Sequence, residues 1–327
     1  MAKHHSNKLT VILVNMGGPE TLEEIKPFLI NLFNDPDIID IPGGRLFRPL
    51  LARWIVYRRL PEVTENFTLI GGGSPLLRIS QDQARALQQA LEDEFDQVQV
   101  RLAMRYSKPF TEEALRDLPE DHQVVVLPLY PQFSTTTTGS SFKELIRVAS
   151  QNGHSPDQFI WIRDYHDHPA FVAAWVRLIQ ETLKRMPPDL RQKAPMLFSA
   201  HGVPVKVIEH GDPYQDQVEK GVRRIVEQLG VSNPVHITYQ SKVGRAEWLE
   251  PATEDMLVQL GRAGESAVVV VPISFVSEHS ETLYELDILL KDVAREAGIQ
   301  HYYRVPTFNA RKEYIQTLKQ VVMEHVQ

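Results

Sequence analysis

Three ionisable side chains lie within four residues in the stretch 277–281, whose sequence is SEHSE. Glu278, His279 and Glu281 offer carboxylate oxygens and an imidazole nitrogen, which a hard or borderline divalent cation accepts as ligands. The run 268–271 before them is short, apolar and β-branched, which is typical of a strand buried in a parallel sheet. Ligands of open α/β sheets bind beyond the carboxyl ends of the strands. The stretch therefore predicts a metal or proton-transfer site.

Two interpretations of these carboxylates stay open. Residues 282–290 are expected to form a helix. If the segment from Glu278 to Glu285 is helical, its three glutamates, with Glu281, would lie on one face, and a divalent cation or a shared proton would offset their mutual repulsion. Alternatively, the carboxylates occupy the first turn of a helix, where they suit the helix dipole and face solvent.

His201 lies in SAHGVP, directly after a second apolar run. Gly202 and Pro204 would end that strand abruptly and leave the imidazole at the same sheet edge as the 277–281 loop. A histidine near a carboxylate at strand ends suits proton abstraction or metal ligation. A histidine with a purely structural role is the competing interpretation.

Eight short β-branched runs define the elements that would position these residues. They are 10–14, 98–103, 124–129, 159–162, 196–199, 235–239, 268–273 and 301–305. Amphipathic patterns such as 83–95 and 218–229 separate most of them, which indicates right-handed βαβ units and parallel sheets. Helix starts are expected at capping boxes formed by Thr21 with Glu24, Ser80 with Gln83 and Ser141 with Glu144.

The loops after the strands match between the two halves of the chain: NMGGP with SAHGVP, RYSKP with YQSKVG, and PLYPQFSTTTTGSS with PISFVSEHSET. The pattern predicts two Rossmann-like α/β domains, each a four-stranded parallel sheet flanked by helices, with the ligand cleft between them. We place the first domain at 1–165 and the second at 166–308. The final segment, 309–327, is expected to form a helix that packs back on the first domain.

The first half carries an insertion at about 27–75. Within it, residues 41–60 contain five arginines and no acidic residue, with apolar side chains expected on one helical face. Those side chains are Phe47, Leu50, Leu51, Trp54 and Ile55. A basic amphipathic helix favours contact with a membrane surface or with an apolar, acidic-tailed ligand. A helix that packs on its own domain with solvated arginines stays open.

Composition narrows the function classes. The 327 residues carry a formal charge of −7, so no basic footprint argues for nucleic acid. The absence of cysteine excludes thiolate zinc sites, cysteine nucleophiles and cysteine-held iron–sulfur clusters within this sequence. No stretch approaches the roughly 20 apolar residues of a membrane span. Nothing in the sequence indicates an oligomeric state.

Other strand-end loops offer contacts for a ligand. Ser134 opens STTTTGSS, which precedes a helix and would either bind an anion or cap that helix. The glycine-rich stretch 70–75 lacks the lysine of a phosphate-binding loop. Arg105 would hold a carboxylate, and Tyr106 and Trp248 would give flat apolar contact.

With these motifs assembled, the chain resembles the ferrochelatases over nearly its whole length. The matching segments include LVNMGGPET, LIGGGSPL, LPLYPQFSTTTTGSS, FSAHGVP, HGDPYQDQV, YQSKVGRAEWLEPATED and PISFVSEHSETLYELD. The resemblance implies two chelatase-type domains and insertion of Fe²⁺ into protoporphyrin IX with release of two protons, the terminal step of haem biosynthesis. The start NMGGP and Trp248 are closer to the protoporphyrin enzymes than to the coproporphyrin branch.

The resemblance also implies roles for individual residues. His201 and Glu281 fall on the family's proton acceptor and metal site, and Glu285 continues the metal site. Substrate-binding positions fall on Met16, Arg105, Tyr106, Tyr130, Ser134, Gln240, Trp248 and His279. Fe²⁺ is then a substrate, and neither a prosthetic group nor an iron–sulfur cluster is expected. A cytoplasmic enzyme is implied, with peripheral contact to the inner membrane through residues 41–60.

Two alternatives remain. A chelatase for another metal or for a more carboxylated tetrapyrrole would line its cleft with more arginines and lysines, and a substrate panel would identify it. A non-catalytic tetrapyrrole carrier would bind the ring without turnover. The histidine expected beside the cleft favours an enzyme.

Overall fold

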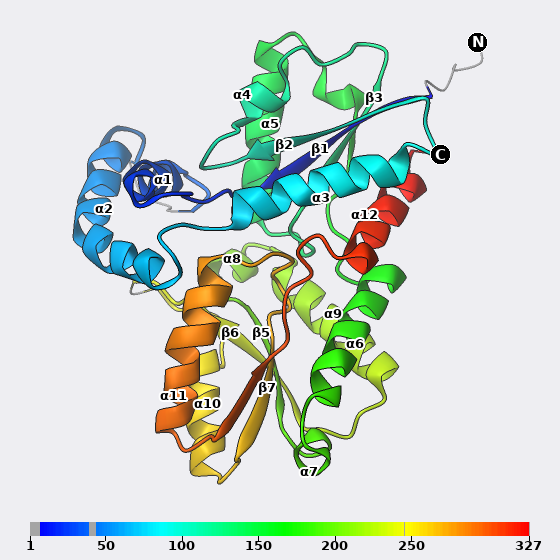
Figure 1. The fold of residues 1–327 in the computed structure, drawn as a ribbon. Helices are drawn as coiled ribbons and strands as arrows, with labels where there is room; N and C mark the ends of the chain where they lie inside the picture. Colours follow the sequence, from blue (N-terminus) through cyan, green and yellow to red (C-terminus); the bar gives the residue numbers. More distant parts are fainter. Residues whose placement is uncertain (1–6, 39–43, 245, 327) are drawn as a thin grey trace. The chain divides into compact units, whose positions relative to one another are not determined.

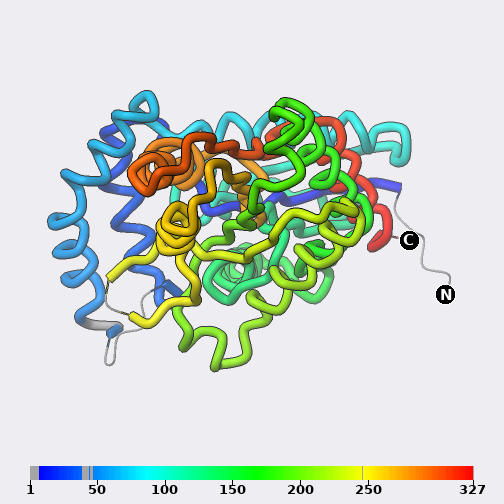
Figure 2. Tube along the Cα trace, turned by 90° about the horizontal axis from the view of Figure 1, so that it is seen from below, coloured from blue at the N-terminus to red at the C-terminus, as the bar shows by residue number. Residues whose placement is uncertain are grey.

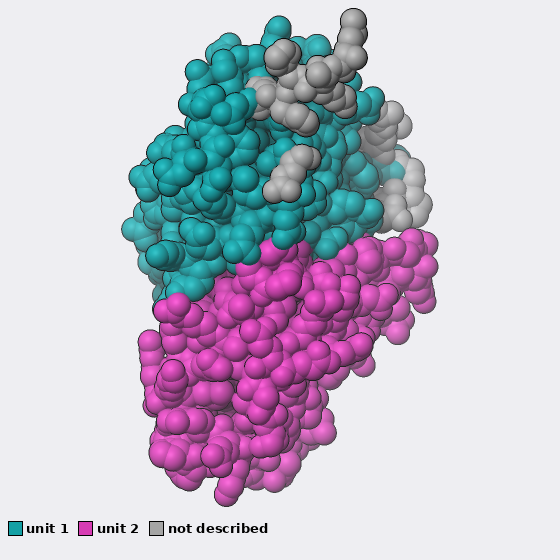
Figure 3. Space-filling view, turned by 90° about the vertical axis from the view of Figure 1, so that its right-hand side faces the viewer, with its two compact units in different colours: residues 1–164, 309–327 teal, residues 165–308 magenta. Residues whose placement is uncertain are grey.

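The computed structural model describes residues 7–38, 44–244 and 246–326. The chain divides into two compact units, which Figure 3 shows in different colours. The first contains residues 1–164 and 309–327, and the second contains residues 165–308.

The first unit is built on a parallel sheet with the strand order β2-β1-β3-β4 (Figure 1). Its strands are β1 (Lys8–Asn15), β2 (Gln97–Met104), β3 (Gln123–Pro128) and β4 (Phe159–Trp161). Its helices are α1 (Leu22–Asn34), α2 (Gly44–Leu69), α3 (Leu76–Leu91), α4 (Thr111–Ala114), η1 (Thr135–Gly139), α5 (Ser140–Gln151), η2 (Pro156–Gln158) and α12 (Lys312–His325). The last of these packs on α3.

The second unit repeats the arrangement with the strand order β6-β5-β7-β8, again all parallel. Its strands are β5 (Met196–His201), β6 (Val235–Gln240), β7 (Ala267–Val271) and β8 (His301–Arg304). Its helices are α6 (Pro169–Lys184), α7 (Pro188–Arg191), α8 (Val205–Glu209), α9 (Tyr214–Leu229), α10 (Thr253–Arg262), η3 (Glu281–Leu289) and α11 (Leu290–Glu296). The predicted fold class of two four-stranded parallel sheets is confirmed.

Each sheet is stabilised by burial of β-branched strands against helices. In the first unit, Val124 and Val126 of β3 pack with Leu145 and Val148 of α5. In the second, β7 is buried along its whole length and packs with α10 and α11. Burial on this scale contributes roughly 1.5–3 kcal/mol for each large apolar side chain. This packing holds the strands in place, so the polar side chains at their carboxyl ends project from a rigid backbone.

Two π-helical segments occupy corresponding places in the two units. The first, η1, follows β3 and runs into α5, and the second, η3, follows β7 and runs into α11. The sequence predicted an ordinary helix over 282–290, so the π-helical winding is a correction. Such i→i+5 segments are rare and occur often at functional sites.

Of the three predicted helix starts, the one at Thr21 is confirmed, because Thr21 is the N-cap of α1, and the other two are wrong. Thr21 makes no side-chain cap, and the Glu24 carboxylate accepts instead from the Glu20 N–H. Ser80 lies inside α3, which begins one turn earlier, and Ser141 lies inside α5. At Ser80 the preceding apolar residues extend α3, and at Ser141 η1 extends the helical winding, so both helices begin before the local signal.

The insertion folds as α1 and α2, which lie side by side at the edge of the first unit (Figures 1 and 2). Ala52 and Val56 of α2 are buried against apolar side chains of α1. Leu51 and Ile55 are half-buried, whereas Phe47, Leu50, Trp54 and Tyr57 are each at least 60% exposed. The predicted single apolar face is therefore divided into a packed side and an exposed side. Residues 41–43 and the side chain of Arg45 lie outside the described part of the chain.

Candidate active site

His201 is the last residue of β5, and its register partner on β6 is Gln240. The Gly202 N–H donates to the Gln240 carbonyl oxygen at 2.8 Å, and a Cβ at Gly202 would lie 2.7 Å from that oxygen. The Tyr214 hydroxyl donates to the His201 carbonyl oxygen at 2.9 Å. These contacts end β5 sharply and fix the backbone from which the imidazole projects.

The Glu281 carboxylate lies beside two imidazoles. Its Oε2 is 3.1 Å from Nδ1 of His201 and 3.6 Å from Nε2 of His279. Nδ1 of His279 donates to the Ser277 carbonyl oxygen, which directs Nε2 toward the carboxylate. The His279 N–H donates to Thr282 Oγ1, so the loop before η3 is held by its own hydrogen bonds. The sequence prediction that His201 and Glu281 meet at one sheet edge is confirmed.

The close contact changes the proton affinity of both partners. Burial alone would lower the pKa of His201, but the negative charge of Glu281 raises it above its ordinary value. Burial alone would raise the pKa of Glu281, but the charge of His201 and contacts with both histidines lower it well below its ordinary value. The carboxylate is therefore ionised and stabilises a proton on His201.

Glu285 is held by the loop after β6 rather than by the two histidines. Its carboxylate accepts from the Ser241 N–H at 2.6 Å, from the Ser241 hydroxyl and from Nε2 of Gln240 at 3.1 Å. Burial, followed by the charge of Glu281, raises the pKa of Glu285. Across the described ranges, no group of three or more His, Asp or Glu side chains stands ready to hold a metal ion. The three-residue metal site at His201, Glu281 and Glu285 thus stays a prediction.

Glu278 does not share a face with Glu281, which corrects the expectation from helical spacing. It precedes η3, and its carboxylate pairs with Arg304 at 2.9 Å. The predicted ladder of three carboxylates is therefore wrong at its first member, because the chain is not yet helical there.

Gln240 and Trp248 lie next to the histidine. Nε2 of Gln240 donates to the Glu281 carbonyl oxygen at 2.9 Å, and its Oε1 accepts from Ser199. Residue Trp248 pairs with Pro204 through a β-bridge, and its ring lies 3.4 Å from a Cβ built on Gly202. An amide and a half-buried indole thus flank the end of β5.

Two candidate residues of the first unit, Arg105 and Tyr106, contact a carboxylate that sequence reasoning missed. Asp35, which follows α1, is buried and pairs with Nη2 of Arg105 at 2.8 Å. The same oxygen accepts from the hydroxyls of Tyr106, at 2.8 Å, and of Ser140. Burial raises the pKa of the Tyr106 hydroxyl. The guanidinium predicted to hold a substrate carboxylate is therefore already paired within the protein.

The remaining candidates of this unit follow β1 and β3. Met16 is half-buried and packs against the apolar side chains of α1 and α2. Tyr130 lies two residues after β3, where burial raises the pKa of its hydroxyl. Ser134 is buried, and its hydroxyl accepts from the Thr136 N–H, so the N-capping interpretation is confirmed.

Comparisons with known proteins address the family directly. The profile of the family described as Ferrochelatase matches residues 8–326. The chain belongs to the ferrochelatase family. It is 45% identical over 323 residues to the ferrochelatase of Trichodesmium erythraeum, covering 97% of this chain and 82% of that one. It is 46% identical over 319 residues to the ferrochelatase of Thermosynechococcus vestitus, covering 96% and 81%.

Solved structures support the fold alone. SirB from Bacillus subtilis, described with Fe³⁺, aligns with a TM-score of 0.56 at 11% identity over 98% of this chain and 96% of that chain. CbiX, described as the terminal enzyme of sirohaem biosynthesis in denitrifying bacteria, aligns with a TM-score of 0.52 at 13% identity, covering 97% and 98%. Ferrochelatases are enzymes that act on porphyrin and iron, so the resemblance drawn from the motifs is confirmed. Among the described helices of the chain, none is long and apolar enough to cross a membrane.

Proposed function

We propose that this chain inserts Fe²⁺ into protoporphyrin IX, with His201 as the acceptor of a pyrrole proton. The observation that carries the proposal is the 3.1 Å contact between His201 Nδ1 and Glu281 Oε2 at the carboxyl edge of the second sheet. Membership of the ferrochelatase family supports the reaction. The pairing supplies a base and an anion in one place, which metal insertion requires.

The reaction balances as the exchange of two protons for one divalent cation. Two pyrrole N–H groups lose their protons, and the four ring nitrogens of the resulting dianion bind Fe²⁺ to give a neutral complex. His201 in its neutral form accepts a proton from a pyrrole nitrogen, and Glu281 stabilises the imidazolium that results. The two side chains offer nitrogen and oxygen donors to the entering iron, with Glu285 as the next carboxylate along η3.

The planar ring hides its nitrogen lone pairs, so the site must bend it. Strain of roughly 1–5 kcal/mol can be drawn from contacts remote from the reacting nitrogens. We assign these contacts to both units. In the first they come from Met16, Arg105, Tyr106, Tyr130 and Ser134, and in the second from Gln240, Trp248 and His279. Because Arg105 is already paired with the buried Asp35, we expect it to contact the ring as part of a rigid surface and not to bind a substrate carboxylate.

A panel of metals and rings tests the assignment of the substrate. The purified protein is mixed without oxygen with Fe²⁺ or Co²⁺ and with protoporphyrin IX, coproporphyrin or a more carboxylated ring. We expect the fastest loss of porphyrin fluorescence with Fe²⁺ and protoporphyrin IX. Faster turnover of another pair would replace the substrate assignment. Binding of every ring without turnover of any would favour a carrier.

We also propose that α2 contacts the membrane surface while the protein otherwise works in the cytoplasm. The exposed side of α2 presents Phe47, Leu50, Trp54 and Tyr57, with the exposed arginines Arg53 and Arg58 beside them. Exposed aromatic and aliphatic groups with flanking cations favour the interface of an anionic bilayer. An apolar substrate would then reach the protein from the lipid surface.

A further inference from the structure

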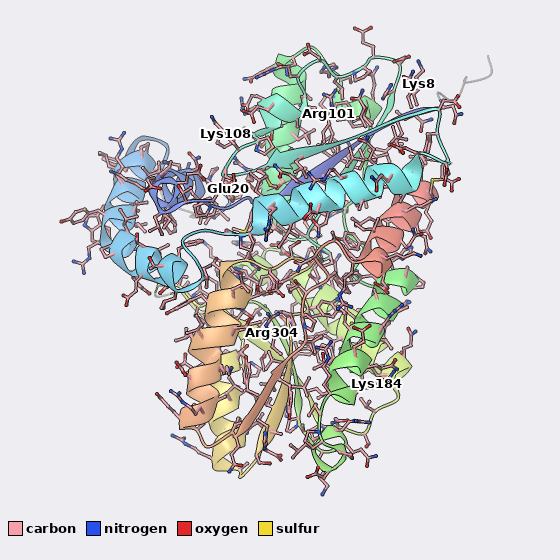
Figure 4. All side chains as sticks on the ribbon, viewed as in Figure 1. Lys8, Glu20, Arg101, Lys108, Lys184 and Arg304 are labelled. Carbon is pink, nitrogen blue, oxygen red and sulfur yellow. The ribbon has the colours of Figure 1, made fainter. Side chains whose placement is uncertain are left out.

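Arg304, the last residue of β8, binds two carboxylates, of which Glu278 is 13% exposed and Asp287 is 36% exposed. The Arg304 side chain is 13% exposed, and it is labelled in Figure 4. Nε and Nη2 form a fork with the two oxygens of Asp287, at 2.6 and 2.7 Å. Nη1 donates to Oε1 of Glu278 at 2.9 Å, and that oxygen also accepts from the Thr307 N–H. One guanidinium therefore uses all three of its nitrogens on two acids.

The two acids bracket the residues proposed to react. Glu278 precedes η3 by three residues, and Asp287 lies near the end of η3. Between them along the chain lie His279, Glu281 and Glu285. The segment follows β7, whereas Arg304 is on β8, so the side chain of Arg304 links both ends of the segment to the edge strand of the sheet.

The contact between Arg304 and Asp287 depends on the π-helical winding of η3. A π-helical segment has i→i+5 hydrogen bonds, and such segments are much rarer in proteins than α-helices. Suppose that the segment between Glu278 and Asp287 changed from π-helical to α-helical hydrogen bonding. The side chain of Asp287 would then turn about the helix axis, relative to Glu278, by about 100° for each residue by which the hydrogen-bond register shifts. A guanidinium fork needs both carboxylate oxygens in its own plane, so it does not tolerate such a rotation. The fork with Asp287 thus favours the π-helical register.

The π-helical register also determines which groups Glu281 and Glu285 contact. In it, Glu281 lies beside His201, and Glu285 lies beside Ser241. We propose that Arg304 is a positioning residue, which holds the 278–287 segment in the register that places Glu281 against His201. The proposal rests on the proposed function for its effect on rate, whereas its effect on structure stands separately.

Hydrogen exchange and steady-state kinetics of the full chain test the proposal together. The variants are Arg304→Gln, Arg304→Lys and Asp287→Asn. Arg295→Gln is the matched control, because Arg295 on the adjacent α11 pairs with Asp292 while its side chain is 72% exposed. Amide exchange is followed in peptides covering 277–290 and, as an internal reference, 196–201. The kinetic readouts are kcat and KM for protoporphyrin IX with Fe²⁺.

We expect Arg304→Gln to speed exchange in 277–290 at least about tenfold and to leave 196–201 unchanged. The kcat should fall about 100-fold, the cost of a small misplacement of reacting groups, while KM changes little. Arg304→Lys keeps the charge but not the fork, so it should restore only part of kcat. Asp287→Asn should behave like Arg304→Gln, and it carries the test if Arg304→Gln does not fold. Arg295→Gln should match the unsubstituted protein.

Unchanged exchange in 277–290 for Arg304→Gln and Asp287→Asn would overturn the proposal. Faster exchange with an unchanged kcat would overturn the positioning role, because the segment would then be loose without consequence. Failure of the unsubstituted protein to metallate protoporphyrin would refute the proposed function instead, and the exchange result would still decide whether Arg304 fixes the segment.

Discussion

At the scale of single residues, the site depends on pairs of charges that set each other's protonation. Glu281 and His201 are 3.1 Å apart, and each shifts the pKa of the other toward the charged form. Below the raised pKa of His201, the resting pair is therefore an imidazolium facing a carboxylate. A neutral His201, which the proposed proton transfer needs as a base, becomes the main form only above the raised pKa.

The titration of His201 should follow from that pairing. In ¹³C-histidine spectra recorded with a chelator, the His201 midpoint should lie above the ordinary value of about 6.5. Replacing Glu281 by Gln removes the negative charge and leaves burial, so the midpoint should move down. A midpoint that is the same in both proteins would contradict the electrostatic account.

Asp35 should matter for stability as well as for placement. Its side chain is 1% exposed, and Asp35→Asn would leave Arg105, at 20% exposure, without its charged partner. Loss of one member of a buried pair costs about 3 kcal/mol in the free energy of unfolding. Urea unfolding followed by tryptophan fluorescence measures it. The control Asp37→Asn loses only a pair with Lys143, whose side chain is 63% exposed, so its cost should stay below about 1 kcal/mol. Equal costs for the two variants would refute a central role for Asp35.

At the scale of elements, strand ends and the turns that follow them place the chemistry. The end of β5 requires glycine at position 202, because a Cβ there would lie 2.7 Å from a backbone oxygen of β6. A backbone oxygen cannot rotate away as the end of a flexible side chain does, so only a shift of the strands themselves would make room. The position therefore controls where His201 sits.

Gly202→Ala should separate the ends of β5 and β6 and displace His201. We expect kcat to fall about 10- to 100-fold with the circular dichroism spectrum unchanged. A steady-state assay with protoporphyrin IX and Fe²⁺ provides the measurement. A kcat equal to that of the unsubstituted protein would mean that the close approach of the two strands does not position the histidine.

The exposed side of α2 should bind anionic bilayers. The test is a flotation assay with vesicles of phosphatidylcholine and phosphatidylglycerol. The double variant Phe47→Ser with Trp54→Ser should bind at least about tenfold more weakly, because each lost side chain removes roughly 1.5–3 kcal/mol of favourable transfer free energy into the apolar phase. Leu289→Ser, which also replaces an exposed apolar residue, is the control and should bind normally. Equal binding by the double variant would refute the membrane contact.

The elements differ in how far sequence predicts them. All eight strands were predicted within about two residues, because β-branched runs bounded by Gly and Pro carry a strong local signal. The π-helical winding of η3 was not predicted, since no periodicity distinguishes it from an α-helix. Asp35 was also missed: NDPD reads locally as a helix stop, and its partners Arg105 and Ser140 lie 70 and 105 residues away in sequence. Contacts of that separation leave no pattern in a single sequence.

At the scale of the whole molecule, the chain repeats one architecture twice and specialises each copy. The strand orders β2-β1-β3-β4 and β6-β5-β7-β8 correspond, and so do the π-helical segments η1 and η3. The two copies differ in what they carry at the strand ends. The first has a buried carboxylate that pairs with arginine, tyrosine and serine, whereas the second has two histidines around a carboxylate. The proposed proton transfer therefore involves residues of the second copy.

The most direct test of this account is the effect of His201→Ala on turnover and on porphyrin binding in the same preparation. The protein is mixed anaerobically with saturating protoporphyrin IX and Fe²⁺, and loss of porphyrin fluorescence gives kcat, while anisotropy without iron gives the Kd for the ring. The account predicts a kcat at least about 100-fold lower, as for the loss of a general base, with the Kd changed less than about threefold. Metallation by His201→Ala at the rate of the unsubstituted protein would contradict it.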